Sequence, residues 1–541
     1  EVPIWNRYLT ETGRASTLTA QVDGGGPSIT YFASGRYQYE DGPIGGTEYG
    51  PATDRLRRMQ TLANLSLVPF NSLRLGVRSG YYNTFNAIPG GGIVGNSIYG
   101  TYALAGYARP ELANCNKSSY VAPATCSGPG NPFGNGAFMS IRESLQQITE
   151  EQVHRVTGAA SATYTPMSEV NVDVTAGWDV TNRNNFSFSR FRYDVDEYTQ
   201  NNIEGSRSTG AQNTRVLTLD AKTSWNRPIT SSLSSALVSG IQVFNDRSIT
   251  TSGSSTNLPG PGIEVVSAGG ANIAVGESFQ TSINGGYFAQ EQLGWKDWAF
   301  LTVGGRYDFA SAFGEDAPGV FYPKASLSVV PSDWATWNSP LGVNTLRVRA
   351  AWGKSGRQPG AFDKFTTFAP LRGEGGAGLV QSQLGNQGLK PETATEIEGG
   401  FEAGFLQDRV GVNATLWQRT VNDLLVARLY PVSGGFRRTQ LSNIGKIDAT
   451  GYELGVRAFA LNQRDLQVEL NANAAYLKQT LKSLGGAPSI KTNAGYIRHR
   501  VFLKVGDPLG SIYVPRLASA CPRGGTTPAS NRLGRPIACY G

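Results

Sequence analysis

Few residues in this 541-residue sequence could carry out catalysis or bind a metal. The two histidines, His154 and His499, lie far apart, and neither sits in a motif typical of a nucleophile or a metal ligand. The acidic segment 314–319 carries the oxygen ligands that calcium prefers, although solvated loop charge is the more common role of such a segment. We therefore predict no catalytic residue, no metal site and no enzymatic activity.

Two glycine-containing segments resemble phosphate-binding loops but lack the required context. The segment 90–95 reads GGGIVG, which fits the glycine spacing of a dinucleotide-binding turn, but it follows Pro89 in a long polar connection rather than a strand. The segment 352–356 reads WGKSG, and Val348 stands where a P-loop requires glycine. We therefore predict that the chain needs no cofactor.

The four cysteines form two local pairs in loop-like sequence. Cys115 and Cys126 lie in one stretch rich in glycine, proline, serine and asparagine, and Cys521 and Cys539 lie in another. Neither pair has the C-x-x-C spacing of a zinc site. Two disulfides within surface loops of an oxidising compartment are the preferred interpretation, with free thiols as the alternative.

The elements that must position these loops are strands. In the segment 169–180, apolar and polar side chains alternate with a period of two, as in a strand with one apolar face and one strongly polar face. The apolar set is Val170, Val172, Val174, Ala176, Trp178 and Val180, and the polar set includes Asn171, Asp173 and Asp179.

About sixteen segments repeat this alternation. Clear examples are 72–82, 213–225, 408–420 and 465–476. Several are ten residues or longer, which suits a tilted membrane strand of roughly 9–11 residues better than a soluble strand of about 5–6 residues. Hydrophobic residues make up only 39% of the chain, and no apolar run is long enough for a transmembrane helix.

Short and long connections alternate along the chain. Short turns are expected at 24–26, 69–72, 165–169, 226–231 and 405–408, and long polar excursions at 40–57, 84–149, 181–212, 247–275, 356–391 and 422–444. An up-and-down meander places every second connection at the same end, so that one rim has tight turns and the other has long loops. We predict an all-β fold, a large antiparallel up-and-down transmembrane β-barrel with short periplasmic turns and long extracellular loops.

In such a barrel the apolar face of each strand meets lipid and the polar face lines a wet lumen. Aromatic residues near the strand ends, Trp178, Trp225, Trp298 and Trp417, are candidates for the interfacial girdles, although each could instead fill an ordinary core. The excess of 48 Lys and Arg over 41 acids is scattered, which argues against a nucleic-acid partner.

Several motifs resemble TonB-dependent outer-membrane transporters. The segment 389–426 and the segment 442–459 resemble consecutive strands of that family, and 26–44 and 505–516 resemble its SusC/RagA-type branch. The residues that carry the resemblance are Asn386, Leu389, Lys390, Pro391, Glu392 and Thr393 in the first motif, and Asn443, Gly445, Lys446, Gly451 and Glu453 in the second.

The resemblance implies TonB-dependent import of a nutrient, of the oligosaccharide or peptide class, across the bacterial outer membrane. Its implied partners are the TonB–ExbB–ExbD energy-coupling system, a SusD-like surface lipoprotein and outer-membrane lipid. Substrate would be captured at the extracellular loops, where Tyr99, Tyr102 and Tyr107 are candidate contacts and loop packing explains them equally well.

The family pattern also indicates that residues 1–541 are a barrel portion of a longer protein. Transporters of this kind have a TonB-contacting segment and a plug before the barrel, and final strands after the last residues present here. Two other functions remain open. One is a siderophore or cobalamin receptor of the same superfamily, which lacks a lipoprotein lid. The other is a non-transporting structural or surface barrel, whose reading frame would encode neither plug nor TonB box.

Overall fold

The computed structural model describes residues 12–42, 54–89, 147–191, 204–315, 319–339, 342–373, 375–431, 433, 439–492, 500–513, 529–530 and 536–537. These residues fall into two compact units. The first extends to Phe313 and includes Pro318–Pro323, and the second contains Gly314–Ala317 and everything from Lys324 onward.

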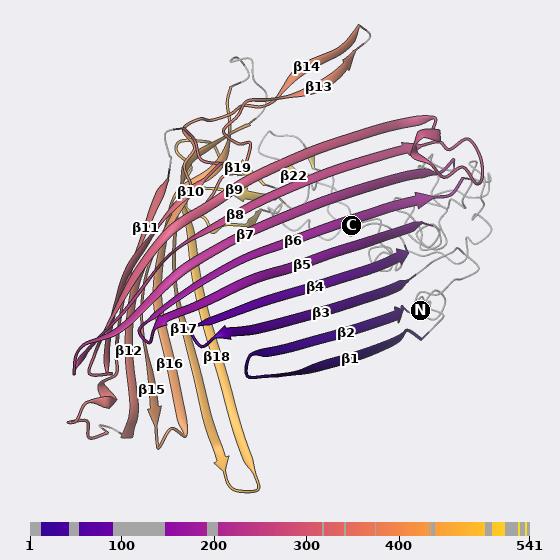
Figure 1. Cartoon of the computed structure of the whole chain (residues 1–541). Coiled ribbons are helices and arrows are strands. Elements are labelled where there is room, and N and C mark those ends of the chain that lie inside the picture. Colours follow the sequence, from indigo (N-terminus) through magenta and orange to yellow (C-terminus); the bar gives the residue numbers. More distant parts are fainter. Residues whose placement is uncertain are drawn as a thin grey trace, which may run out of the picture. The chain divides into compact units, whose positions relative to one another are not determined.

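The first unit is a meander in which each strand pairs antiparallel with its sequence neighbours (Figure 1). Its strands are β1 (Arg14–Gly26), β2 (Ile29–Asp41), β3 (Arg55–Phe70), β4 (Leu73–Pro89), β5 (Ile148–Met167), β6 (Val170–Ser189), β7 (Ser206–Thr230), β8 (Leu233–Thr256), β9 (Ala271–Trp295) and β10 (Ala299–Ala310). A 3-10 helix, Val266–Ala268, lies between β8 and β9. Strand β11 (Val320–Val329) is divided between the units.

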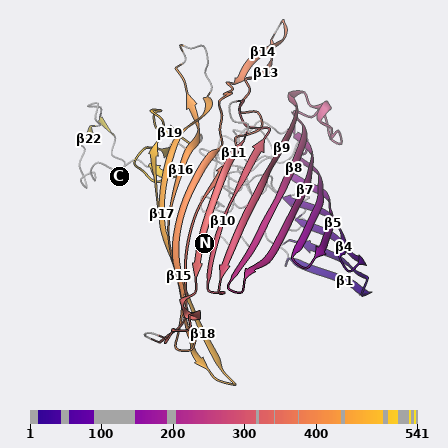
Figure 2. The ribbon, with the colours of Figure 1, turned by 60° about the vertical axis from the view of Figure 1, so that its left-hand side comes forward.

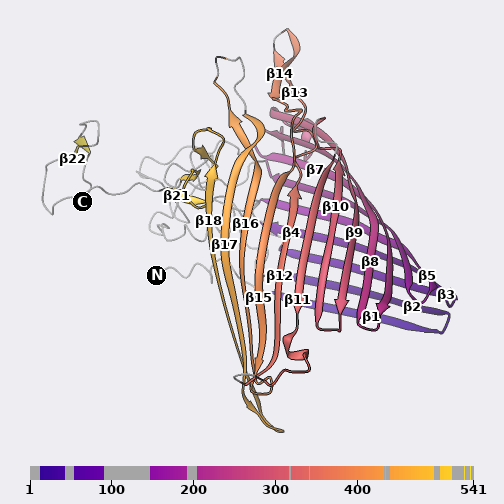
Figure 3. The ribbon, with the colours of Figure 1, turned by 90° about the vertical axis from the view of Figure 1, so that its left-hand side faces the viewer.

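The second unit continues the same antiparallel pattern. Its long strands are β12 (Val343–Arg357), β15 (Glu392–Phe405), β16 (Val410–Leu429), β17 (Thr439–Asn462) and β18 (Gln467–Ser483), which lie side by side in Figures 2 and 3. The shorter elements are the 3-10 helix Pro331–Asp333, the hairpin β13 (Thr367–Gly373) and β14 (Gly376–Gln383), β19 (Ile490–Lys491), β20 (Arg500–Leu503), β21 (Ser511–Tyr513), β22 (Ala529–Ser530) and β23 (Pro536–Ile537).

The structure confirms the antiparallel up-and-down prediction and its count of about sixteen strands, since the main sheet contains sixteen. Strand β6 begins at Val170, as the alternation of segment 169–180 indicates. Short and long connections alternate from β1 to β10, but the connection 330–342 between β11 and β12 is longer than 311–319 before it, where the alternation predicts a short turn. Backbone with positive φ at Lys296, Asp297 and residues 406–408 forms two of the tight turns. Among the described residues, no helix is long and apolar enough to cross a bilayer.

Several of the long connections are shorter than predicted, so the predicted residues at which they begin and end were wrong. Strand β6 continues to Ser189, β7 begins at Ser206, and β8 runs to Thr256, all inside segments predicted as loops. Apolar alternation stops before these ends, but the backbone ladder continues because polar side chains can keep pairing where water reaches them. The strands are therefore about twice as long as their apolar stretches.

A cluster of buried side chains lies in the second unit, where β16 and β18 end and β17 begins. Val426, Ile447, Leu481 and Leu484 form it, and Leu424 and Ile444 are among the partly buried residues that pack against it. This small core fixes the ends of three long strands, and it lies next to the motif residues of segment 386–393.

Candidate functional site

The polar face of the first unit is a connected network of side chains. Thr163 Oγ1 donates to Asp173 Oδ1 at 2.7 Å, and Asn171 Nδ2 donates to Asp173 Oδ2 at 2.8 Å. Arg155 forms an ion pair with Asp179 on the neighbouring strand. The period of two places these groups on one face, so that adjacent strands present their polar residues to each other.

The second unit has a corresponding network on β12, β15 and β16. Arg349 Nη1 donates to Glu402 Oε1 at 2.8 Å, and its Nη2 donates to Thr415 Oγ1 at 2.8 Å. Arg419 forms an ion pair with Glu396. The charged side chains of these two ion pairs are 32–49% exposed, so each pair contributes at most about 1 kcal/mol to stability. Their main effect is a wetted surface on which opposite charges are already paired.

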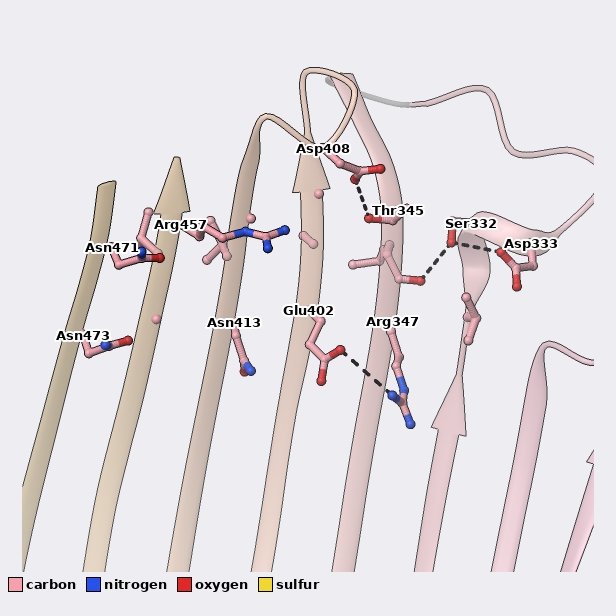
Figure 4. A pocket seen from close by; sticks show the side chains of 18 residues that line it. Ser332, Asp333, Thr345, Arg347, Glu402, Asp408, Asn413, Arg457, Asn471 and Asn473 are labelled. Carbon is pink, nitrogen blue, oxygen red and sulfur yellow. Dashed lines mark hydrogen bonds and ion pairs between the residues drawn. The ribbon is translucent and has the colours of Figure 1, made fainter. Parts of the chain in front are cut away.

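A hollow of about 720 Å³ lies on this face of the second unit, close to the turn between β15 and β16 (Figure 4). Arg347, Glu402, Asn413, Asn471 and Asn473 line it from four strands, as the labelled side chains show. The carboxamides and guanidinium groups can exchange hydrogen bonds with water or with a polar solute. Near the turn, Thr345 Oγ1 donates a hydrogen bond to Asp408 Oδ1 at 3.0 Å, so hydroxyl and carboxylate groups also line the hollow.

The opposite face of both units is apolar and exposed. In the first unit Val174, Trp178 and Leu219 are 37–44% exposed, and in the second Leu416 and Leu470 are 68% and 58% exposed. Within the described part of the chain, no second β layer covers these side chains. Exposed aliphatic rows of this extent on a large sheet indicate contact with hydrocarbon.

The residues of segment 386–393 meet β16 and β17 in what we call the signature cluster: Asn386, Leu389, Lys390, Glu392, Asp423 and Asn443. Asn443 accepts a hydrogen bond from Lys390 N at 2.9 Å and donates to Lys390 O at 2.7 Å and Asp423 O at 2.9 Å. Glu392 Oε1 accepts from Leu425 N at 2.9 Å, where the register of β16 against β17 shifts. The cluster therefore stabilises an irregular point in the sheet.

The other motif residues have separate structural roles. Pro391 and Leu389 are fully buried. A Cβ on Gly445 would lie 2.7 Å from Leu424 Cβ, so that any larger residue would push these strands apart. The remaining motif residues are placed by strand register: Thr393 opposite Asn422, Lys446 opposite Ser483, Gly451 opposite Trp417 and Glu453 opposite Thr415.

Residues 129–516, well over half of the chain, match the family described as TonB dependent receptor-like, beta-barrel. The chain belongs to this family. The polar face is accordingly the inner wall of an outer-membrane barrel, and the apolar face is its lipid-facing wall. The tight turns are those expected at the periplasmic rim.

Individual relatives agree with this assignment. The TonB-dependent receptor P26 of Formosa agariphila is 26% identical over 211 residues, which cover 38% of this chain and 21% of that protein. The TonB-dependent receptor SusC of Bacteroides thetaiotaomicron is 24% identical over 192 residues, covering 34% and 19%. A RagAB peptide transporter structure has a similar fold, with a TM-score of 0.74, 18% identity and coverage of 91% of this chain and 54% of that one. The chain thus spans about half of that structure and matches about a fifth of each curated relative.

Three of the four predicted girdle tryptophans are compatible with the barrel, but Trp417 is not. Trp178 is 37% exposed on the lipid-facing wall, Trp225 is equally exposed opposite Val170, and Trp298 lies in the β9–β10 turn. Trp417 pairs with Glu398 and has the Arg419 guanidinium 5.6 Å from its ring. It therefore lies on the inner wall, and the girdle assignment of this residue was wrong.

Other predicted residues lie outside the described part of the chain. They are Tyr99, Tyr102 and Tyr107, the cysteines Cys115, Cys126, Cys521 and Cys539, and His499. Their roles in substrate contact and in disulfides stay predictions. His154 is described, and its Nδ1 lies 2.9 Å from the Tyr81 hydroxyl on the neighbouring strand β4.

Sequence reasoning missed the wall residues Arg347, Arg349 and Glu402. Each occupies a polar position of an alternating strand, so its face could be read from the sequence. The hydrogen-bond partner of each residue could not be read from the sequence, because Arg349 and Glu402 meet only once the register of β12 against β15 is fixed. The regular alternation of charged residues in segments 343–357 and 392–405 was the available signal.

Proposed function

We propose that this chain forms the wall of an importer that moves a nutrient of the oligosaccharide or peptide class across the outer membrane, driven by TonB. The observation that carries the proposal is the contrast between the two faces of the strands. One face is polar and carries the ion pairs between Arg349 and Glu402 and between Arg155 and Asp179. The opposite face is apolar and exposed to lipid.

The inner wall suits polar but weakly charged solutes. Several of its cations, among them Arg155, Arg349 and Arg419, are paired with carboxylates, so that near these pairs a passing solute meets hydrogen-bonding groups rather than a strong field of one sign. Asn413, Asn471 and Asn473 add donors and acceptors in the hollow near the periplasmic rim. Sugar hydroxyls and peptide amides are the solute groups that such a surface accommodates.

The similarity to SusC and to RagAB supports the SusC/RagA-like assignment and, with it, two kinds of partner. The first is the TonB–ExbB–ExbD system, which would supply energy from the proton gradient. The second is a SusD-like surface lipoprotein that would cover the long extracellular connections. A gene for such a lipoprotein next to this one would favour the proposal over a siderophore or cobalamin receptor.

Uptake by intact cells tests the proposal. Cells that carry the complete gene are expected to accumulate a fluorescent oligosaccharide or peptide from a panel of both classes, and a protonophore is expected to abolish that uptake. The control is a strain that lacks the gene, in which the same solute should not accumulate. Uptake that persists after the proton gradient collapses would contradict active import, and uptake of ferric siderophores alone would favour the alternative receptor.

A further inference from the structure

On two neighbouring strands of the first unit, β7 and β8, the lipid-facing residues change from apolar to polar at the same level. On β7 the outward residues, followed from the tight β7–β8 turn towards the start of the strand, include Trp225, Ala221, Leu219 and Leu217. The next outward residue is Arg215. On β8 the outward aliphatic residue Val243 is followed by Asn245 and Arg247, and Ile249 comes next on the same face. On these two strands the apolar run that begins at the tight turn is therefore interrupted at this level, although the outward residues Phe279 and Val275 of β9 are strongly exposed beyond it.

Two arginines face each other at this level of β7 and β8. Arg215 of β7 and Arg247 of β8 are direct partners in the antiparallel ladder, and both are exposed on the lipid-facing side. Directly opposite residues hold their Cβ atoms about 4.5–5.5 Å apart, and two like charges at this separation repel. Neither arginine forms an ion pair with another described residue. The electrostatic interaction of the two arginines is therefore unfavourable by itself, and an anion bound between them would make it favourable.

The surroundings supply hydrogen-bond donors but little negative charge. Asn245 precedes Arg247 on the same face, and Asn213, which donates a hydrogen bond to Asn182, follows Arg215 upward. Asp246 is adjacent in sequence to Arg247, but the period of two turns it to the inner wall. On β9 the nearest outward acid, Glu277, pairs with Thr251, four residues beyond Arg247.

The height of the pair identifies the source of the anion. Arg215 and Trp225 are separated by ten positions on one strand. At about 3.3 Å per residue and a tilt of about 40°, this is about 25 Å along the membrane normal, the height of the apolar band of such barrels. Trp225 lies near a periplasmic turn, so Arg215 and Arg247 reach the headgroups of the outer leaflet.

We propose that Arg215 and Arg247 form a binding site for the anionic headgroup of an outer-leaflet glycolipid, with its phosphate or carboxylate between the two guanidinium groups. Two planar guanidinium groups present parallel N–H donors, the geometry that binds phosphate and carboxylate bidentately. The bound lipid would cancel the repulsion between β7 and β8 and anchor these two long strands to the membrane surface.

Reconstitution of the complete protein tests the site. The protein is placed in phosphatidylcholine nanodiscs containing lipid A, or lipid A stripped of phosphate, and retained lipid is counted by native mass spectrometry. The wild type is expected to retain phosphorylated lipid A, and R215Q/R247Q to bind it at least about tenfold more weakly, the loss of a charge-assisted bidentate contact. R215K/R247K, which keeps the charge without the planar fork, should be intermediate.

The matched control removes two exposed positive charges from periplasmic turns, K296Q/R464Q, and should bind lipid A as the wild type does. In detergent without anionic lipid, R215Q/R247Q should be at least as thermostable as the wild type, because the repulsion is gone. Equal retention of lipid A by the wild type and R215Q/R247Q would overturn the proposal. So would equal binding of dephosphorylated lipid A, or displacement of lipid A by inorganic phosphate at equal concentration, which would assign the site to a free anion.

Discussion

Replacement of Leu389 by alanine is expected to lower the free energy of unfolding by about 2–5 kcal/mol. Leu389 is fully buried in the signature cluster, and its backbone carbonyl accepts a hydrogen bond from Gly314 N at 3.0 Å. The surrounding backbone is held by Asn443 and Glu392, so it cannot collapse into the space that the leucine leaves. Thermal unfolding in detergent, followed by the loss of β-sheet circular dichroism, measures the effect.

The same substitution at Leu379 provides the control. Leu379 lies on the β13–β14 hairpin and is 73% exposed, so its truncation removes little buried surface and should change stability by less than about 0.5 kcal/mol. Equal losses at Leu379 and Leu389 would show that the cluster does not fix the strand ends. A smaller loss is expected for N443D, which keeps the oxygen that accepts from Lys390 N but loses both donated hydrogen bonds.

Replacement of Leu219 by arginine is the second change with a large expected effect. Leu219 is 44% exposed and lies about midway between Arg215 and Trp225 on the lipid-facing wall. A cation at the middle of the hydrocarbon costs about 2–4 kcal/mol in a transmembrane barrel. Reversible unfolding in urea from lipid vesicles should show this loss of stability.

The neighbouring position gives a matched comparison. Thr218 precedes Leu219 on the same strand but faces the inner wall, opposite Gly177 and Phe244. An arginine there can keep its charge in a wet environment, so T218R should lose much less stability than L219R. If T218R proved the more harmful of the two, the two faces of β7 would have been assigned the wrong way round.

The fold could be predicted from the sequence because a membrane barrel repeats one simple rule. Apolar and polar residues alternate in segment 169–180 and in its counterparts, and glycine- or proline-containing turns separate them. The alternation records which face meets lipid, so it remains visible without knowledge of which strands pair. The polar ends of β7 and β8 escaped prediction because, above the membrane, both faces meet water and the period disappears.

Trp417 shows a different kind of error. The prediction placed it by its distance from the strand end and ignored its parity. Val412, Ala414 and Leu416 occupy even positions and face lipid, so Trp417, at an odd position, must face inward. The information was present in segment 408–420, and applying the period of two would have recovered it.

The signature cluster could be recognised from its residues but not understood from them. Asn386 to Thr393 and Asn443 stand out as motifs, yet about fifty residues separate them in the chain. Only the fold shows that Asn443 binds the backbone of Lys390 on both sides, and that Glu392 binds the backbone at an irregular point in β16. Contacts of this kind depend on strand register, which no local pattern specifies.

Spin labels on β7 test the central claim, that lipid covers the apolar wall and water reaches the polar one. Labels attached to L217C and L219C, and to T218C and D220C, would be compared in the complete protein in lipid bilayers, with the signal of the native cysteines subtracted. Oxygen, which concentrates in hydrocarbon, should relax the labels at 217 and 219 strongly and those at 218 and 220 weakly. Labels at 217 and 219 that oxygen cannot reach would mean that protein covers this face, and would contradict the account.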